Sequence, residues 1–388
     1  MIRPLLLGTM LLAAAVPATG ANRTAPITPA RLDAVVSSAM ARTKARGLAV
    51  AVIDSGRVRI VRAYGTRNGA GAPLTTETIM YGASLTKMVF ATMVMQLVDE
   101  DKLELDRSIA TLLPKPLPDY ADGEEKYADW RPLAGDERWR RITPRMLLTH
   151  SAGFANFGFL EPDGKLRVHF TPGSRYAYSG DGMILLQFVI ERGLGLDVGA
   201  EVQRRVFDRF EMRRSSLHWR PDFAANLADG WDSEGQPQPH DERGRVRAAG
   251  SMDSTIGDVA RFAAAFVRGQ ATSARSRRAM VAPQLAITTR SQFPTLQPEA
   301  PRADRIAGLA AGLGLVRFDG PQCAGFYKGG HDDITGNTLV CLQRRRRCVV
   351  IMANDVRAEA GFPAIVRAVL GETGMPWRSE YGPKEWAR

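Results

Sequence analysis

The sequence predicts an α+β fold: an antiparallel sheet built from both chain ends, flanked by helices, with an inserted mostly helical domain. Strand-like segments rich in valine and isoleucine lie near the start of the chain, at 48–65, and near its end, at 325–355. Between them, helical fragments are interrupted by frequent proline and tryptophan, and no clear strand is evident. We therefore expect residues 22–100 and 246–388 to form a sheet domain and residues 101–245 to form the inserted helical domain.

The first 21 residues have the layout of a secretory signal peptide. Arg3 precedes an apolar stretch from Leu5 to about Val16, and small residues follow, with a cleavage point near Gly20 or Ala21. The apolar stretch is short for a membrane span, and no other apolar run reaches spanning length. We expect an exported protein, periplasmic or secreted and without a membrane span. An uncleaved N-terminal anchor is the alternative.

The formal net charge of +11 describes a basic protein. The basic residues are spread along the 388-residue chain and no nucleic-acid-binding motif accompanies them, so we expect no nucleic-acid partner. The simplest interpretation is a soluble basic surface. In an exported protein, such a surface also favours anionic cell-wall polymers through its overall field.

The elements of the N-terminal part follow in order. Thr28 and Pro29 lead an amphipathic helix. The segment 48–65 alternates in hydrophobicity and turns at Ser55–Gly56, as a β-hairpin does. The segment from Leu85 to Glu100 is apolar on every face, which is typical of a buried helix.

The C-terminal part begins with another helix. Thr255 and Asp258 have capping-box spacing at its start, and Gly269 is an end signal. Three consecutive antiparallel strands are then predicted at 325–332, 337–343 and 348–355, followed by a closing helix at 362–374.

The run from Arg344 to Arg347 lies between two of these strands, and adjacent like charges repel, so we expect a solvated hairpin loop. Cys341 and Cys348 flank this loop and could face each other, while Cys323 could compete for either partner. The pairing stays open, and a monomer keeps one free thiol. The chain has no Cys-x-x-Cys and no metal-ligand spacing of histidines, so we expect no metal and no cofactor.

Ser84 and Lys87, in the segment YGASLTKMVF, form the only Ser-x-x-Lys spacing in the chain. At a helix N-terminus, free N–H groups and the helix dipole favour negative charge beside the serine oxygen. Lys87 follows one turn later on the same face, and desolvation would let it act as a neutral base. A helix that starts with a serine and carries a surface lysine is the alternative. The signatures Gly-x-Ser-x-Gly, His-Glu-x-x-His and the Walker loop are absent from the sequence.

Two further segments fit the same chemistry. TPGSRYAYSGDGMILL places Tyr178 before Ser179 and Gly180, and FYKGGHDD places Lys328 before two glycines on a strand. With LLTHSAGF, AAGSMDSTIGDVARF and the order of strands and helices, the chain resembles the serine β-lactamase and penicillin-binding-protein superfamily over about residues 30–373. It looks closest to the class C β-lactamase-like branch, which also includes esterases and D-amino-acid peptidases. The resemblance implies a β-lactamase/transpeptidase-like fold and serine hydrolase activity.

The resemblance also implies a role for each matching residue. Ser84 would be the acylated nucleophile, and Lys87 and Tyr178 would share the proton transfers, with Lys87 helping to hold Tyr178 as a phenolate or poised base. Lys328 would add positive potential and anchor the substrate. The backbone N–H groups of Ser84 and His331 would form the oxyanion hole, while the His331 side chain is either a bystander or a catalytic group.

Two departures from the family pattern concern substrate recognition. Gly180 stands where much of the family has an asparagine that contacts the substrate's amide group. Lys328 is followed by Gly329 and Gly330, so the threonine hydroxyl that helps to grip a substrate carboxylate is missing. Glycines on a strand permit close approach of a substrate, but both lost groups recognise β-lactams and D-Ala-type peptides. We therefore do not expect efficient β-lactamase activity.

The leading hypothesis is an exported serine hydrolase that forms an acyl-enzyme at Ser84. Its substrate would be a small ester, a D-amino-acid peptide or amide of peptidoglycan type, or a β-lactam. One alternative is a catalytically weak cell-wall-binding or β-lactam-sensing protein with the same fold. Another is a basic wall- or nucleic-acid-associated protein with salt-sensitive binding. The oligomeric state stays open, and in the tail Trp377 and Trp386 either pack on the body or mark a partner contact.

Overall fold

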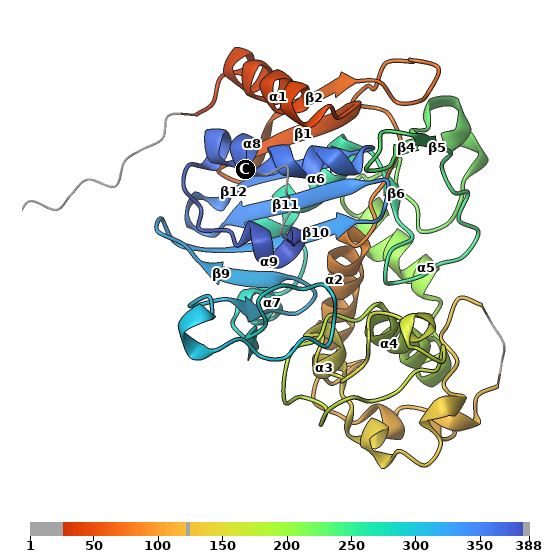
Figure 1. Ribbon diagram of the computed structural model, residues 1–388. Coiled ribbons are helices and arrows are strands. Elements are labelled where there is room, and N and C mark those ends of the chain that lie inside the picture. The colour runs from red at the N-terminus through yellow and green to blue at the C-terminus, as the bar shows by residue number, and fades with distance from the viewer. Residues whose placement is uncertain (1–25, 122–124, 383–388) are drawn as a thin grey trace, which may run out of the picture.

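The computed structural model describes residues 26–121 and 125–382 of the chain (Figure 1). Its main feature is an eight-stranded sheet with the strand order β2-β1-β12-β11-β10-β9-β8-β7, in which every neighbouring pair is antiparallel. The strands are β1 (Gly47–Asp54), β2 (Arg57–Gly65), β7 (Leu285–Ala286), β8 (Ala310–Ala311), β9 (Val316–Asp319), β10 (Ala324–His331), β11 (Gly336–Leu342) and β12 (Arg347–Ala353). Because β1 pairs with β12, the predicted sheet from both chain ends is confirmed.

The central strands are buried on both faces, and alternate residues serve different cores. On β1, Leu48, Val50 and Val52 pack in a cluster with helices α1 (Pro29–Thr43) and α8 (Phe362–Leu370). The intervening residues of β1 belong to a larger cluster with helices α2 (Leu85–Asp99) and α6 (Ile256–Arg268). The sheet is therefore a middle layer between two sets of helices, as Figure 1 shows.

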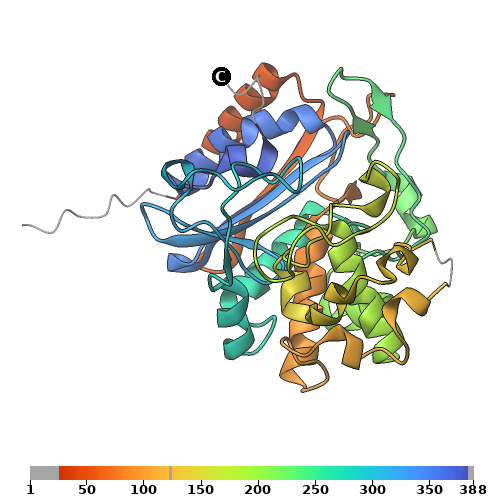
Figure 2. The same cartoon turned by 60° about the horizontal axis from the view of Figure 1, so that its bottom comes forward.

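Helix α2 connects the sheet to the helical part of the molecule. Thirteen of its fifteen residues are buried, which confirms the expectation from its apolar faces. In Figures 1 and 2 it runs from the sheet into the region of α3 and α4. The remaining helices are α3 (Pro144–Leu148), α4 (Gly180–Gly193), α5 (Val198–Val202), α7 (Ala274–Val281), α9 (Trp377–Tyr381) and a π-helix at Gln203–Asp208.

The predicted helix signals hold at both ends of α6. The Thr255 side chain accepts a hydrogen bond from the Asp258 N–H, and Gly269 takes the left-handed conformation with φ of 79°. The reciprocal bond of a capping box, from the Thr255 N–H to the Asp258 side chain, is not formed. The Asp258 carboxylate accepts instead from the Arg214 N–H and the Ser215 hydroxyl. Thr28 likewise caps α1, with Pro29 in its first turn.

Several short strands depart from the sequence expectations. Within 101–245, β4 (Gly230–Trp231) and β5 (Pro237–Gln238) pair with each other, so the expectation of no strand there was wrong. A second small pair joins β3 (Met80–Tyr81) to β6 (Asp253–Ser254). Two-residue strands leave no periodic pattern in a sequence, and tertiary contacts decide them. The domain boundaries at 101 and 245 stay a prediction.

The hairpin between β11 and β12 settles two open points. Cys341 and Cys348 are paired directly in register and form a disulfide, and Cys323 is free. Arg344–Arg346 form an exposed turn, as expected for adjacent like charges. Arg347 is different because it lies on β12, only 9% exposed, and its guanidinium donates to the Val369 carbonyl.

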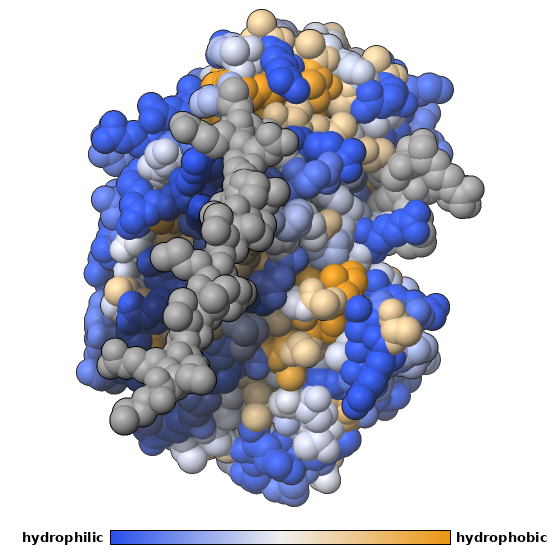
Figure 3. Space-filling view, turned by 90° about the vertical axis from the view of Figure 1, so that its left-hand side faces the viewer, coloured by the Kyte–Doolittle hydropathy of each residue, from blue (hydrophilic) through white to orange (hydrophobic). Residues whose placement is uncertain are grey.

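Polar side chains cover much of the face shown in Figure 3, with smaller apolar patches between them. In the described part of the chain, no helix is both long enough and apolar enough to cross a membrane. The predicted signal peptide, residues 1–21, lies outside the described residues, as does Trp386.

Candidate active site

Ser84 stands at the first turn of α2 and presents its hydroxyl to two other side chains. The turn before it is sharp, with Ala83 at φ of 45°. The Ser84 side chain makes no capping bond to its own helix. Instead its Oγ accepts from Lys87 Nζ at 2.9 Å and from the Tyr178 hydroxyl at 2.8 Å. The three residues singled out in the sequence thus meet at one oxygen atom.

Lys87 is held in a dry environment. It is 1% exposed, and its Nζ also donates to the Ala249 carbonyl at 2.5 Å. Burial, together with the positive charges of Lys328 and Arg247, holds the pKa of Lys87 well below its usual value, while Glu380 acts in the opposite direction. A lysine in such a site loses its proton more readily than a lysine in water and can serve as a base.

Tyr178 is also buried, and burial opposes the phenolate form that the resemblance implied. Burial raises the pKa of Tyr178 above its ordinary value, and the hydrogen bond to Ser84 offsets this only in part. The Nζ atoms of Lys87 and Lys328 lie 4.9 Å and 5.3 Å from the centre of its ring. The cations therefore contact the aromatic face of the ring, and burial is the largest influence on the phenol. Tyr178 is a hydroxyl donor in this arrangement.

His150 positions the tyrosine segment, a role that the sequence analysis did not assign. Its ring packs 4.4 Å from the Tyr178 ring, centre to centre. Its Nδ1 accepts from the Ser179 N–H at 3.2 Å, and its carbonyl accepts from the Ala177 N–H at 2.8 Å. His150 thus holds the residues on both sides of Tyr178. The only sequence signal was its place in LLTHSAGF.

Strand β10 lies against the N-terminus of α2 through Gly330. A β-carbon at Gly330 would stand 2.8 Å from the Leu85 amide nitrogen and 3.0 Å from that of Ser84. Glycine is therefore required for the two backbones to meet. Lys328, two residues earlier, is 3% exposed, and burial lowers its pKa. His331 follows, and its Nδ1 lies 3.1 Å from Oε1 of Glu359.

The absence of a side chain at Gly180 and at Gly329, the two other glycines of the predicted site, can be explained by steric crowding. A β-carbon at Gly180 would overlap the ring of Phe157, and one at Gly329 would overlap the carboxylate of Glu380. The space that a side chain would take is thus filled from elsewhere in the fold. Neither Phe157 nor Glu380 carries a sequence motif, so sequence reasoning had no means of finding them.

A cavity of about 910 Å³ opens onto these groups. Ser84, Lys87, Tyr178 and His331 line it, whereas Lys328 and the three glycines of the predicted site do not. The rest of its lining is mixed: it includes an apolar rim formed by the exposed Phe159 and Leu160, the acidic Asp232, Glu234, Asp332 and Asp333, and the basic Arg247 and Arg357.

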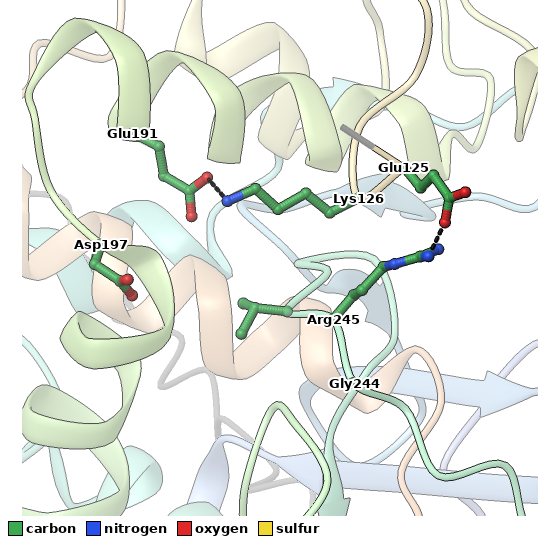
Figure 4. Close-up of a pocket in the computed structure, with 7 residues that line it drawn as sticks. Glu125, Lys126, Glu191, Asp197, Gly244 and Arg245 are labelled. Carbon is green, nitrogen blue, oxygen red and sulfur yellow. Dashed lines mark ion pairs between the residues drawn. The ribbon is translucent and has the colours of Figure 1, made fainter. Parts of the chain in front are cut away.

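A second cavity, of about 580 Å³, is lined mainly by charged residues (Figure 4). Lys126 pairs with Glu191 at 3.1 Å, and Arg245 pairs with Glu125. The carboxylate of Asp197 caps α5 by accepting from the Ala200 N–H at 2.8 Å. These charges already have partners, so the cavity offers no comparable chemistry. Within the described ranges, no cluster of three histidine, cysteine or acidic residues could hold a metal ion.

Comparisons with known proteins agree with this geometry. The Beta-lactamase family model matches residues 32–371. Among curated proteins, Esterase EstB of Burkholderia gladioli is 29% identical over 240 residues, 54% of this chain and 56% of that protein. The D-aminopeptidase of Gluconobacter oxydans (strain 621H) is 28% identical over 194 residues, 48% of this chain and 35% of that protein. The chain thus spans about half or less of these relatives.

Among solved structures, the octameric penicillin-binding protein homologue from Pyrococcus abyssi superposes with a TM-score of 0.69. The match covers 90% of this chain and 78% of that one at 19% identity, so it shows a shared fold. The resemblance drawn from the sequence is confirmed. Because the family model covers most of its length, this chain belongs to the Beta-lactamase family of serine hydrolases.

Proposed function

We propose that this protein is an exported hydrolase that cleaves small, uncharged carboxylic esters through an acyl-enzyme at Ser84. The observation that carries the proposal is the double contact at Ser84 Oγ, with Lys87 Nζ at 2.9 Å and the Tyr178 hydroxyl at 2.8 Å. A nucleophile needs a base within hydrogen-bond reach, and Lys87 Nζ meets that distance, while the Tyr178 hydroxyl is close enough to serve as the proton donor. Export rests on the predicted signal peptide at residues 1–21.

In the proposed acylation step, neutral Lys87 takes the Ser84 proton while Oγ attacks the ester carbonyl carbon. The N–H groups of Ser84 and His331 are the proposed donors to the tetrahedral oxyanion, because Gly330 brings β10 against the start of α2. The Tyr178 hydroxyl gives its proton to the leaving alkoxide as the C–O bond breaks, and the Lys87 ammonium returns a proton to Tyr178. Water then hydrolyses the acyl-enzyme and restores Ser84.

Esters are preferred over β-lactams and D-Ala-type peptides because of the two glycine positions. The amide expected at position 180 is replaced by the ring of Phe157, and the hydroxyl expected at position 329 is replaced by the Glu380 carboxylate. The Phe157 ring cannot hydrogen-bond a substrate amide as an asparagine side chain does, and the Glu380 carboxylate cannot donate a hydrogen bond to a substrate carboxylate and repels its charge. Esterase EstB, one of the relatives, supports ester chemistry by its name.

The test compares the wild type with Ser84→Ala. Turnover of p-nitrophenyl acetate is followed by absorbance, and intact mass is recorded after exposure to a penicillin. We expect ester turnover by the wild type alone, with no lasting penicillin adduct. A persistent adduct on Ser84 without ester turnover would favour the β-lactam-sensing alternative. Equal ester turnover by Ser84→Ala would overturn the proposed mechanism.

A further inference from the structure

Glu380 is a buried acid placed directly behind the strand that carries Lys328. It lies on α9, in the tail whose role the sequence left open, and is 2% exposed. Its carboxylate occupies the space that a β-carbon on Gly329 would need, so it contacts the backbone of β10. A threonine side chain at position 329 and the Glu380 carboxylate in its present position would therefore occupy the same space.

The position of Glu380 is fixed by the packing around it. The Tyr327 hydroxyl hydrogen-bonds the Glu380 carboxylate. The neighbouring Tyr381 donates to the Asn337 carbonyl of β11 at 2.7 Å, and its ring packs 5.6 Å from that of His331. Helix α9 is thus tied to two strands of the sheet, and the carboxylate cannot swing away to solvent.

The charge of Glu380 acts on the catalytic cations. Its carboxylate favours the protonated forms of Lys328 and Lys87, against the effect of burial on each. In a dry interior, opposite charges interact strongly over several ångströms. Glu380 therefore offsets part of the positive potential that these two lysines would otherwise present to the cavity.

We infer that Glu380 is a specificity-determining residue that makes the active-site cavity reject substrates with a carboxylate and accept neutral ones. The inference rests on the proposed function and deepens it. An anionic substrate group that approached Lys328 would also meet the field of the Glu380 carboxylate, which lies against Gly329, the next residue of the strand. Such a built-in repulsion separates substrates of equal size by charge alone.

The experiment measures kcat/KM for two matched ester pairs with wild type and Glu380→Gln. Phenyl acetate and 3-carboxyphenyl acetate differ by a carboxylate on the leaving group. The p-nitrophenyl esters of propionic acid and of succinic acid (the monoester) differ by a carboxylate on the acyl group. We expect Glu380→Gln to raise kcat/KM for the anionic member of at least one pair by roughly tenfold, as for a unit charge at partly screened distance. At a pH where the activity of both proteins has levelled off, the neutral members should change by less than about twofold, and the gain should appear mainly in KM.

Controls separate charge from structure. Glu372→Gln removes an equal charge from an exposed pair with Arg367 and should leave the anionic-to-neutral ratio unchanged. Glu380→Asp keeps the charge and should keep the wild-type ratio. If Glu380→Gln does not fold, Glu380→Leu removes the charge while filling the space, with the same expectation. If the anionic-to-neutral ratio of kcat/KM is unchanged in a folded variant without the Glu380 charge, the inference is wrong. If the wild type hydrolyses none of the four esters, the proposed function is wrong instead.

Discussion

Gly330 lies so close to Ser84 that an added β-carbon would stand 3.0 Å from the Ser84 amide nitrogen. The contact joins the strand that carries Lys328 and His331 to the start of α2, where Ser84, the proposed nucleophile, lies. We predict that Gly330→Ala pushes β10 away from α2 and displaces one proposed oxyanion donor. Overpacking of this kind costs about 1–3 kcal/mol of stability, and loss of one oxyanion donor costs roughly 10²-fold in kcat.

The matched control is Gly244→Ala, because a β-carbon at Gly244 meets no atom within 4 Å. Thermal melting and ester turnover are measured for both variants. Wild-type kcat in a folded Gly330→Ala protein would show that the contact does not position the nucleophile.

Lys87 is predicted to trade stability for catalysis. Its ammonium is buried at 1% exposure, so Lys87→Met should lower kcat by about 10³-fold or more and raise the free energy of unfolding by about 1 kcal/mol.

The pKa of Lys87 is lowered in the folded state, so folding releases a proton at pH values between that pKa and the usual value of 10.5. Stability of the wild type therefore rises with pH across that window, and the advantage of the methionine variant should shrink toward pH 10.5. Denaturant titrations at several pH values measure this, and a constant difference would contradict it.

The pH dependence of kcat/KM should report the same lysine. The charges that act on it are Lys328 and Arg247, which lower its pKa, and Glu380, which raises it. Because the neutral amine is the proposed base, activity should rise as pH rises through the pKa of Lys87 and level off well below pH 10.5. Glu380→Gln removes the only charge that raises this pKa among those named, so it should move the rising limb to lower pH. If kcat/KM rises at the same pH in Glu380→Gln as in the wild type, a group other than Lys87 controls that rise.

Much of this arrangement could be predicted because it is encoded locally. The alternating β1 and β2, the apolar α2 and the Thr255 cap each carry their own pattern of side chains. The meeting of Ser84, Lys87 and Tyr178 followed from motif order, although the distances did not.

What could not be predicted depends on contacts between distant segments. Phe157 fills the space beside Gly180, and Glu380 fills that beside Gly329, and neither pair is visible as a motif. The environment of Tyr178 could not be predicted for the same reason: the sequence does not show the burial of the phenol, which raises its pKa.

The apolar rim of the cavity should set a preference for the length of the acyl chain. Phe159 and Leu160 are 67% and 61% exposed, the highest values among the large hydrophobic side chains that the structure describes as exposed. Both line the cavity that contains Ser84, and the Phe159 ring stacks on that of Phe157 at 5.1 Å. Apolar surface left in water at a site mouth gains free energy when a ligand covers it. Phe159→Ala should therefore lower kcat/KM for p-nitrophenyl hexanoate by roughly three- to tenfold and leave p-nitrophenyl acetate nearly unchanged.

The comparison variant is Ile306→Ala, which removes another exposed hydrophobic side chain, 40% exposed, that does not line this cavity. Its hexanoate-to-acetate ratio should equal that of the wild type. If Phe159→Ala also keeps the wild-type ratio, the rim does not contact the acyl chain. If both esters slow equally, the loop at Gly158–Leu160 supports the structure of the site and does not select the substrate.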